Sequence, residues 1–408
     1  RENATIANRR ADLLKAQQLA GRSEEAANDT VSALLALKAH FLNRLNGGDS
    51  TEPKIYSAMV AALERFNPQV RLRTPNFIPY QMKFDPADGK AFFVSVEGTP
   101  YRSIQASRGS DYESPQVKSL RFSNRALAIS DDRKTVWLAD EDHQIYQYDA
   151  DDLFLSKDAY KKSEDPILMT GHTGRINKMV YDSDNKRLYS AGQDGKVFEW
   201  DVTADPPKRR ELFSNITVPI TALAISDNGK LIAVGTDDLI TVTSHDWEDF
   251  HLKYPTKSRV TSIDFHPRYR KLAFGMENGW VGFVDVEDAN YSSLSVHASR
   301  VSDIAYSPNG RFIASASYDR TVRMFEINHE DDEPIVFSGH RSWVLGLQFS
   351  QDSRQLYSFS KDQQVRTWYT EPDAVKQRIC DIVQRRDLGS AAKAQYEFKE
   401  DVQNYLCD

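Results

Sequence analysis

The sequence predicts an all-β fold, a seven-bladed β-propeller, with a helical segment in front of it. Three stretches of the chain align with one another without a gap, and four fainter copies lie around them. The copies recur every 40 to 52 residues, which is the length of one four-stranded propeller blade. A chain of 408 residues is long enough for such a ring and an additional segment.

Composition limits the class of protein. Apolar residues make up 40% of the chain and aromatic residues 11%, which excludes a disordered chain and allows a large core. The formal net charge of −7 argues against a nucleic-acid-binding protein, which usually has a basic face. No run of about twenty apolar residues is present, so we expect no membrane-spanning segment within this chain. Because the chain starts at Arg1 without a Met, we interpret it as a fragment and expect an upstream part, with a membrane anchor as one option.

The three gapless copies share four residue types at fixed spacing. A His is followed 18 residues later by a Ser, then after four residues by an Asp, and after six more by an aromatic residue. The positions are His172, Ser190, Asp194 and Trp200; His297, Ser315, Asp319 and Phe325; and His340, Ser358, Asp362 and Trp368.

These residue types can satisfy one another inside a blade. The turn Asp can accept from the His, the His can bond the strand Ser, and the Ser hydroxyl can accept the indole N–H of a Trp, so each buried polar atom has a partner. Phe325 has no N–H to donate, so we expect an incomplete network in the middle copy. With Gly171-His172 near its start and Trp200-Asp201 at its end, the first copy resembles the WD-repeat family. That resemblance implies a seven-bladed WD-repeat propeller that binds protein partners.

The fainter copies complete the ring. Expected strands at 135–138, 230–234 and 271–274 lead to turns at Asp142, Asp238 and Asn278, and a polar insertion at 151–165 lengthens one spacing. A seventh, degenerate copy lies at 80–84 and 91–96. The last copy ends at its third strand. Residues 70–74 alternate apolar and charged side chains and are predicted to add the outermost strand of that blade.

We divide the chain into a helical lead-in at 1–67, the propeller at 68–372 and a C-terminal tail at 373–408. In the lead-in, apolar residues at helical spacing predict one helix that stops at Gly47-Gly48. A second helix is predicted from Pro53 to the residue before Asn67-Pro68.

The lead-in also resembles a particular group of proteins. The stretches from Leu34 to Ala39 and from Ile55 to Ala58 are similar to the lead-in of bacterial WD-repeat regions attached to STAND-type signalling NTPases and related membrane-anchored proteins. In that group the helices follow a transmembrane segment. The resemblance therefore implies a membrane-associated bacterial protein.

The tail resembles the same group through Cys380, the segment Arg385-Arg386-Asp387-Leu388, and Cys407. It departs from the group's pattern because Asp387 stands where Asn is usual and the expected Trp is absent. A disulfide between Cys380 and Cys407 would close a loop worth roughly 3 kcal/mol and would require an oxidising compartment. We therefore expect the periplasm or another extracytoplasmic face of a bacterial membrane. Two unrelated thiols are the alternative, in which case the location is cytoplasmic.

Catalytic chemistry has little support in the sequence. The repeated sets contain the residue types of a Ser-His-Asp triad, but an active site has no reason to occur three times, whereas a structural network does. His245 and His251 flank Trp247, yet neither an HExxH motif nor a Cys/His cluster accompanies them. We therefore predict no catalytic residue, no metal and no cofactor.

The predicted partner-binding residues belong to one face of the ring. By resemblance to WD-repeat propellers, residues just before the turn Asp and at the start of the innermost strand line the mouth that partners use. They are Arg175, Arg300, Tyr318, Trp343 and Lys361, together with Gln193 and Glu277. Arg, Tyr and Trp are the residue types of binding hot spots. The alternative interpretation is ordinary surface with one Trp that packs between blades.

These observations predict an interaction scaffold or sensor domain in a membrane-anchored bacterial assembly or signalling protein, with protein partners and no nucleic acid. The alternative is a propeller enzyme, a lyase or hydrolase with its active site at the central channel. Such an enzyme needs acid, base or metal ligands that converge on the channel mouth. A mainly structural role in an envelope complex is a third interpretation.

Overall fold

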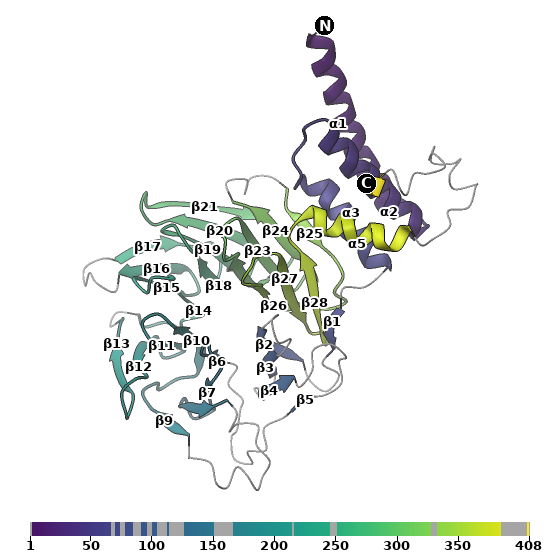
Figure 1. The fold of residues 1–408 in the computed structure, drawn as a ribbon. Coiled ribbons are helices and arrows are strands. Elements are labelled where there is room, and N and C mark those ends of the chain that lie inside the picture. The colour runs from purple at the N-terminus through teal and green to yellow at the C-terminus, as the bar shows by residue number, and fades with distance from the viewer. Residues whose placement is uncertain are drawn as a thin grey trace.

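Figure 1 shows a ring of β-sheets with a group of helices beside it. The computed structural model describes residues 2–66, 70–73, 78–84, 91–95, 100–103, 112–113, 126–150, 166–213, 216–244, 251–327, 333–384 and 406–407. The predicted insertion at 151–165 and the segment 245–250 lie outside these ranges. The helices are α1 (Glu2–Glu25), α2 (Asp29–Leu45), α3 (Pro53–Phe66) and α5 (Pro372–Val383).

Seven four-stranded sheets form the blades of the ring. Blades 1 to 6 each use four consecutive strands, from β2–β5 through β22–β25, and blade 7 combines β26, β27 and β28 with β1. Strand β1 pairs antiparallel with β28, with Arg73 opposite Gln364, so the predicted closing strand is present. The innermost strands of blades 2 to 7 contact one another in sequence, and β26 contacts β2. The predicted all-β propeller with an N-terminal helical segment is confirmed.

The strand bounds follow the predicted copies. In blades 1 to 3 they are β2 Pro79–Phe84, β3 Ala91–Ser95, β4 Pro100–Ser103, β5 Tyr112–Glu113; β6 Leu127–Ile129, β7 Thr135–Ala139, β8 Ile145–Asp149, β9 Ile167–Met169; β10 Ile176–Asp182, β11 Arg187–Gly192, β12 Val197–Asp201, β13 Lys208–Glu211. In blades 4 and 5 they are β14 Ala222–Ile225, β15 Leu231–Gly235, β16 Leu239–Ser244, β17 His251–Pro255; β18 Val260–Phe265, β19 Lys271–Met276, β20 Trp280–Asp285, β21 Asn290–Ser295. In blades 6 and 7 they are β22 Val301–Tyr306, β23 Phe312–Ser317, β24 Val322–Glu326, β25 Ile335–Phe337; β26 Val344–Phe349, β27 Gln355–Ser360, β28 Gln364–Tyr369, β1 Val70–Arg73.

The turn between the second and third strands has one form in five blades. The residue after the turn Asp or Asn adopts a left-handed backbone, with φ from 63° to 88°, at His143, Gly195, Gly279, Arg320 and Gln363. Glycine adopts this conformation freely, and at Arg320 and Gln363 the carboxylate of the turn Asp supports it by accepting the backbone N–H of the residue that follows. The turn at Asp238 is one residue shorter than these five. Its closing hydrogen bond runs from Thr236 N to Leu239 O, and the turn contains no left-handed residue.

The innermost strands share a second local feature. In five of them a β-bulge follows the first residue: β10, β18, β22 and β26, and also β2. A bulge adds one residue to a strand and re-aims the side chains beside it. It therefore changes which residues at the start of each strand face the centre of the ring.

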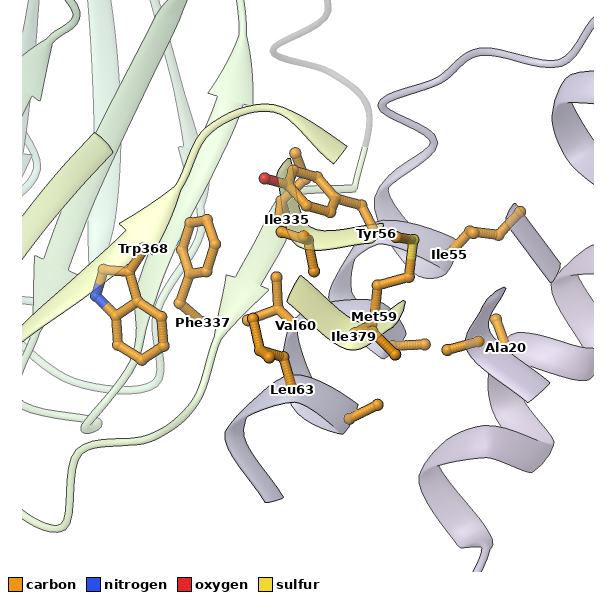
Figure 2. Close-up of a cluster of buried hydrophobic side chains, with 14 of the residues drawn as sticks. Ala20, Ile55, Tyr56, Met59, Val60, Leu63, Ile335, Phe337, Trp368 and Ile379 are labelled. Atoms are coloured by element: carbon orange, nitrogen blue, oxygen red, sulfur yellow. The ribbon is translucent and has the colours of Figure 1, made fainter. Parts of the chain in front are cut away.

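The helices pack beside blades 6 and 7, as Figure 1 shows. In Figure 2, Tyr56 and Val60 of α3 lie against Ile335 and Phe337 of β25. The rings of Tyr56 and Phe337 meet edge to face, with centroids 6.4 Å apart. Ser57 Oγ accepts a hydrogen bond from Val336 N at 2.9 Å. Helix α3 thus covers strand β25, whose edge would otherwise be open to pairing with another chain.

The tail folds back onto the lead-in. Ile379 of α5 lies beside Met59 of α3 in Figure 2, and helices α1, α2, α3 and α5 share one hydrophobic core with blades 6 and 7. Arg44 Nη1 of α2 donates to Asp373 Oδ1 of α5 at 2.6 Å. Cys380 and Cys407 form a disulfide. The segments that precede and follow the ring therefore form one helical unit, defined here as α1, α2, α3 and α5.

Candidate functional site

The predicted polar network of blade 3 is present as hydrogen bonds. His172 Nε2 lies 2.8 Å from Ser190 Oγ, and His172 Nδ1 lies 3.0 Å from Asp194 Oδ2. Trp200 Nε1 donates to Ser190 Oγ at 2.8 Å. The serine hydroxyl is completely buried, so these bonds replace all of its contacts with water.

Blade 7 repeats this arrangement. His340 lies 2.8 Å from Ser358 Oγ and 3.0 Å from Asp362 Oδ2, and Trp368 Nε1 donates to Ser358 Oγ at 2.7 Å. The Asp also accepts the backbone N–H of Arg341, which ties the turn to the preceding loop.

Blade 6 lacks the indole donor. His297 lies 2.9 Å from Ser315 Oγ and 2.8 Å from Asp319 Oδ2, but Phe325 occupies the position of the Trp. Thr321 Oγ1 donates to Asp319 at 2.6 Å, a contact that the sequence pattern did not reveal. The network therefore has one fewer bond at the serine and one more at the aspartate.

Protonation in these networks follows from their burial. Burial lowers the pKa of the three histidines, although the aspartate partners act in the opposite direction: His172, His297 and His340. Burial also acts to raise the pKa of the aspartates, but hydrogen bonds and the histidines outweigh it and the net pKa is lowered. At neutral pH the histidine is thus neutral, with Nδ1–H donating to a carboxylate and Nε2 accepting from the serine. The residues fix the blade and offer no exposed nucleophile.

The predicted partner-binding residues lie together at one end of the ring. We call this end the upper face; it carries the turns between the second and third strands. Backbone hydrogen bonds of 2.8 to 3.0 Å join each turn residue to the start of the innermost strand in the same blade: Gln193 to Arg175, Glu277 to Arg259, Tyr318 to Arg300, and Lys361 to Trp343. The blades therefore hold these side chains in fixed relative positions.

Four of these side chains form a cation–aromatic column that crosses from blade 6 to blade 7. The rings of Tyr318 and Trp343 stack with centroids 4.4 Å apart and an interplanar angle of 3°. Arg300 lies over Tyr318 at 5.5 Å, and Lys361 lies over Trp343 at 4.4 Å. Trp343 remains 43% exposed. Trp343 therefore packs against the neighbouring blade and is also open to solvent.

A chain of ion pairs extends the column to blade 4. Arg300 Nη1 lies 3.6 Å from Glu277, and Arg259 Nε lies 3.7 Å from the other oxygen of Glu277. Arg259 also donates to Asp237 at 2.6 Å, and this hydrogen bond lowers the pKa of Asp237. Arg259 is not among the residues predicted from the sequence. It precedes Val260 just as Arg300 precedes Val301, so the repeat register could have identified it.

A cavity of about 410 Å³ opens beneath these residues at the centre of the ring. Residues from the innermost strands of several blades line it, including all of Arg175, Ile176, Asn177 and Lys178 at the bulge of β10. Asp303 is the one carboxylate among the described lining residues. It accepts hydrogen bonds from Ser262 Oγ at 2.8 Å and Leu347 N at 3.1 Å, so both of its oxygens join neighbouring blades.

In the part of the chain that the structure describes, no three His, Cys, Asp or Glu side chains gather as a metal site. His251 begins β17, but His245 and Trp247 lie outside the described residues. None of the described helices is both long and apolar enough to cross a membrane. The charged residues of the described cavity wall are four cations and one carboxylate, Asp303, which is engaged with neighbouring blades.

The blades and their networks define a class: a propeller of repeats, three of which use a His, a Ser and an Asp to join the turn between the second and third strands to the preceding loop. The model of the WD domain, G-beta repeat family matches residues 166–201, 289–326 and 333–369. These are the three segments that contain the networks. These three segments of the chain are therefore WD repeats.

Comparison with known proteins finds relatives at low identity. Protein LST8 homolog of Drosophila melanogaster is 25% identical over 224 residues, which cover 51% of this chain and 69% of that protein. WD repeat-containing protein 1 of Xenopus tropicalis is 26% identical over 300 residues, 70% of this chain and 46% of that protein. Actin-interacting protein 1 of Drosophila melanogaster is 26% identical over 210 residues, 50% of this chain and 34% of that protein. The chain thus spans less than half of the latter two relatives.

Proposed function

We propose that this chain is a protein-interaction scaffold whose upper face docks a protein partner. The observation that carries the proposal is the cation–aromatic column of Arg300, Tyr318, Trp343 and Lys361. Large aromatic and Arg side chains held in fixed positions lose little conformational entropy on binding, so they serve well as anchors. WD-repeat proteins act as interaction scaffolds, and one relative is named for its interaction with actin.

The exposed indole favours binding over a purely architectural role. Trp343 already has Tyr318 on one ring face and Lys361 near it, yet 43% of the residue is open to solvent. A partner that covers this surface removes apolar area from water at about 25 cal/mol per Å². The same partner also strengthens the cation–π contacts by desolvating them.

The test is affinity purification with substituted baits. Tagged wild-type chain and the variants Trp343→Ala, Tyr318→Ala and Arg300→Ala are incubated with extract of the native source, and retained proteins are quantified by mass spectrometry. The matched control is Tyr269→Ala, which removes a 63% exposed aromatic residue from the turn between β18 and β19, at the other end of the blades. We expect a partner that wild type and Tyr269→Ala retain and that Trp343→Ala loses at least tenfold. A partner retained equally by all variants contradicts the proposal.

We further propose that the scaffold serves as the sensor or docking part of a membrane-anchored bacterial assembly or signalling protein, on the extracytoplasmic side. The support for this placement is the resemblance of the lead-in and tail to that bacterial group. The relatives named above come from animals and add nothing to it. The disulfide Cys380–Cys407 fits an oxidising compartment. Alkylation of protein isolated from its source without reductant tests this placement. Protected cysteines support it, and two freely alkylated cysteines contradict it.

A further inference from the structure

The charges around the central cavity are unevenly compensated. The chain as a whole carries −7, yet four of the described cavity-lining residues are cations: Arg175, Lys178, Arg259 and Arg300. Arg259 is paired with Asp237, and Arg300 faces Glu277. Arg175 and Lys178 on blade 3 form no ion pair with a carboxylate in the described ranges. The blade 3 side of the cavity therefore holds two cations that a ligand can neutralise.

The opposite side of the cavity is apolar. Leu345, Leu347 and Phe359 of blade 7 line it, together with Met82 of blade 1. Trp343 lies two residues before Leu345 in the sequence, and its indole is exposed on the upper face. Among the described residues, the cavity thus presents two cations without a carboxylate partner on one side and apolar side chains on the other.

We propose that the cavity receives an acidic side chain from a segment of a protein partner, next to an aromatic or aliphatic residue of that segment. The carboxylate faces Arg175 and Lys178, and the apolar neighbour lies against blade 7 and Trp343. This inference rests on the proposed function and specifies the chemistry of the partner. A free inorganic anion would leave the apolar wall and the exposed indole unused, so a peptide segment accounts for more of the surface.

The bulge of β10 explains why both cations reach the cavity. In a regular strand alternate residues face opposite sides, so Arg175 and Lys178, three residues apart, would point in different directions. The register between β10 and β11 shifts between Ile176 and Lys178, and this extra residue restores both side chains to the same side. Two cations without carboxylate partners on one concave wall favour a negatively charged ligand by charge complementarity.

The experiment is a selection from a phage-displayed library of random dodecapeptides on the immobilised full chain. Selections run in parallel on wild type, on Arg175→Ala/Lys178→Ala, and on Trp343→Ala. The matched control is Lys134→Ala/Lys230→Ala, which also removes two positive charges, from exposed turns at the other end of the blades. Selected peptides are sequenced and re-measured by fluorescence anisotropy at low and high salt.

We expect wild type and the control to select peptides rich in Asp or Glu beside an aromatic or aliphatic residue. On Arg175→Ala/Lys178→Ala their dissociation constants rise about tenfold and lose most of their salt dependence. On Trp343→Ala the same peptides weaken while their salt dependence persists. Peptides that depend on Trp343 but show no acidic preference overturn this inference and leave the proposed function standing. Peptides that bind all variants equally, or no enrichment on any, overturn both.

Discussion

The three networks allow one substitution to be compared in two settings. Ser358 in blade 7 accepts the indole N–H of Trp368 and contacts His340, whereas Ser315 in blade 6 contacts only its histidine because Phe325 replaces the Trp. Both serines are at most 1% exposed. Ser→Ala at each position removes the same atom from similarly buried surroundings. The difference between the two variants therefore isolates the indole N–H.

The magnitude follows from the number of polar groups left without a partner. A buried donor or acceptor that loses its hydrogen bond costs about 1 to 3 kcal/mol. Ser358→Ala leaves two such groups, the indole N–H and Nε2 of His340, and Ser315→Ala leaves one. We expect Ser358→Ala to lower the free energy of unfolding by about 1 to 3 kcal/mol more than Ser315→Ala does. Ser190→Ala in blade 3, where Trp200 donates, is expected to resemble Ser358→Ala.

Urea unfolding followed by tryptophan fluorescence and by circular dichroism measures these differences as shifts in midpoint at constant slope. A further variant, Trp368→Phe, removes the indole donor. In that background the cost of Ser358→Ala is expected to fall to that of Ser315→Ala. Equal destabilisation by Ser358→Ala and Ser315→Ala in the wild-type background would refute the reasoning.

Three other predictions concern pH and the disulfide. Because the folded-state pKa of buried histidines such as His340 lies below the ordinary 6.5, the folded protein binds fewer protons than the unfolded chain, so stability is full above pH 6.5 and is lost as the pH falls below it. Melting temperatures from pH 8 to pH 5 test this, and a flat profile contradicts it. Burial raises the pKa of Asp264 to about 7, above the ordinary 3.8, so Asp264 destabilises the fold once it ionises. Because the side chain of Asp264 is partly exposed, solvent screens part of this effect. We expect Asp264→Asn to raise the free energy of unfolding by roughly 1 to 2 kcal/mol at pH 8 and to leave it unchanged near pH 3.5. An equal gain at both pH values argues against ionisation as the cause. Reduction of the Cys380–Cys407 disulfide is expected to lower the stability of the helical unit by up to about 3 kcal/mol. A protease should then cleave α5 faster than it cleaves the blades. An unchanged rate of cleavage contradicts a stabilising role for the disulfide.

Much of the ring could be predicted because its polar residues recur at fixed spacing. The network residues lie at the same places in the three blades that carry them, so the register of one copy locates the next. The same register places Arg259 at the mouth of the cavity, although Arg259 was not among the residues predicted from the sequence. The shorter turn at Asp238 was not anticipated, because a single missing residue is hidden within the natural variation of blade length.

The contacts between blades and between chain ends could not be predicted in this way. Tyr318 and Trp343 belong to different blades, and their parallel stacking depends on side-chain rotamers that no spacing encodes. Helix α1 has few apolar residues, so helical periodicity hardly marks it. Arg44 and Asp373 are 329 residues apart, and nothing in either segment indicates the other. Local patterns specify elements, whereas the helical unit depends on tertiary packing.

The pairing of β1 with β28 has a consequence for synthesis on the ribosome. Strand β1 is made early, but its partner follows about 290 residues later. At a synthesis rate of about 5 to 20 residues per second, β1 lacks its partner strand for roughly 15 to 60 s. Its alternating Val-Arg-Leu-Arg sequence suits that interval, because charges along an unpaired strand discourage association with other nascent chains. The ring thus cannot close before β28 has been made, and β1 must stay soluble during that interval.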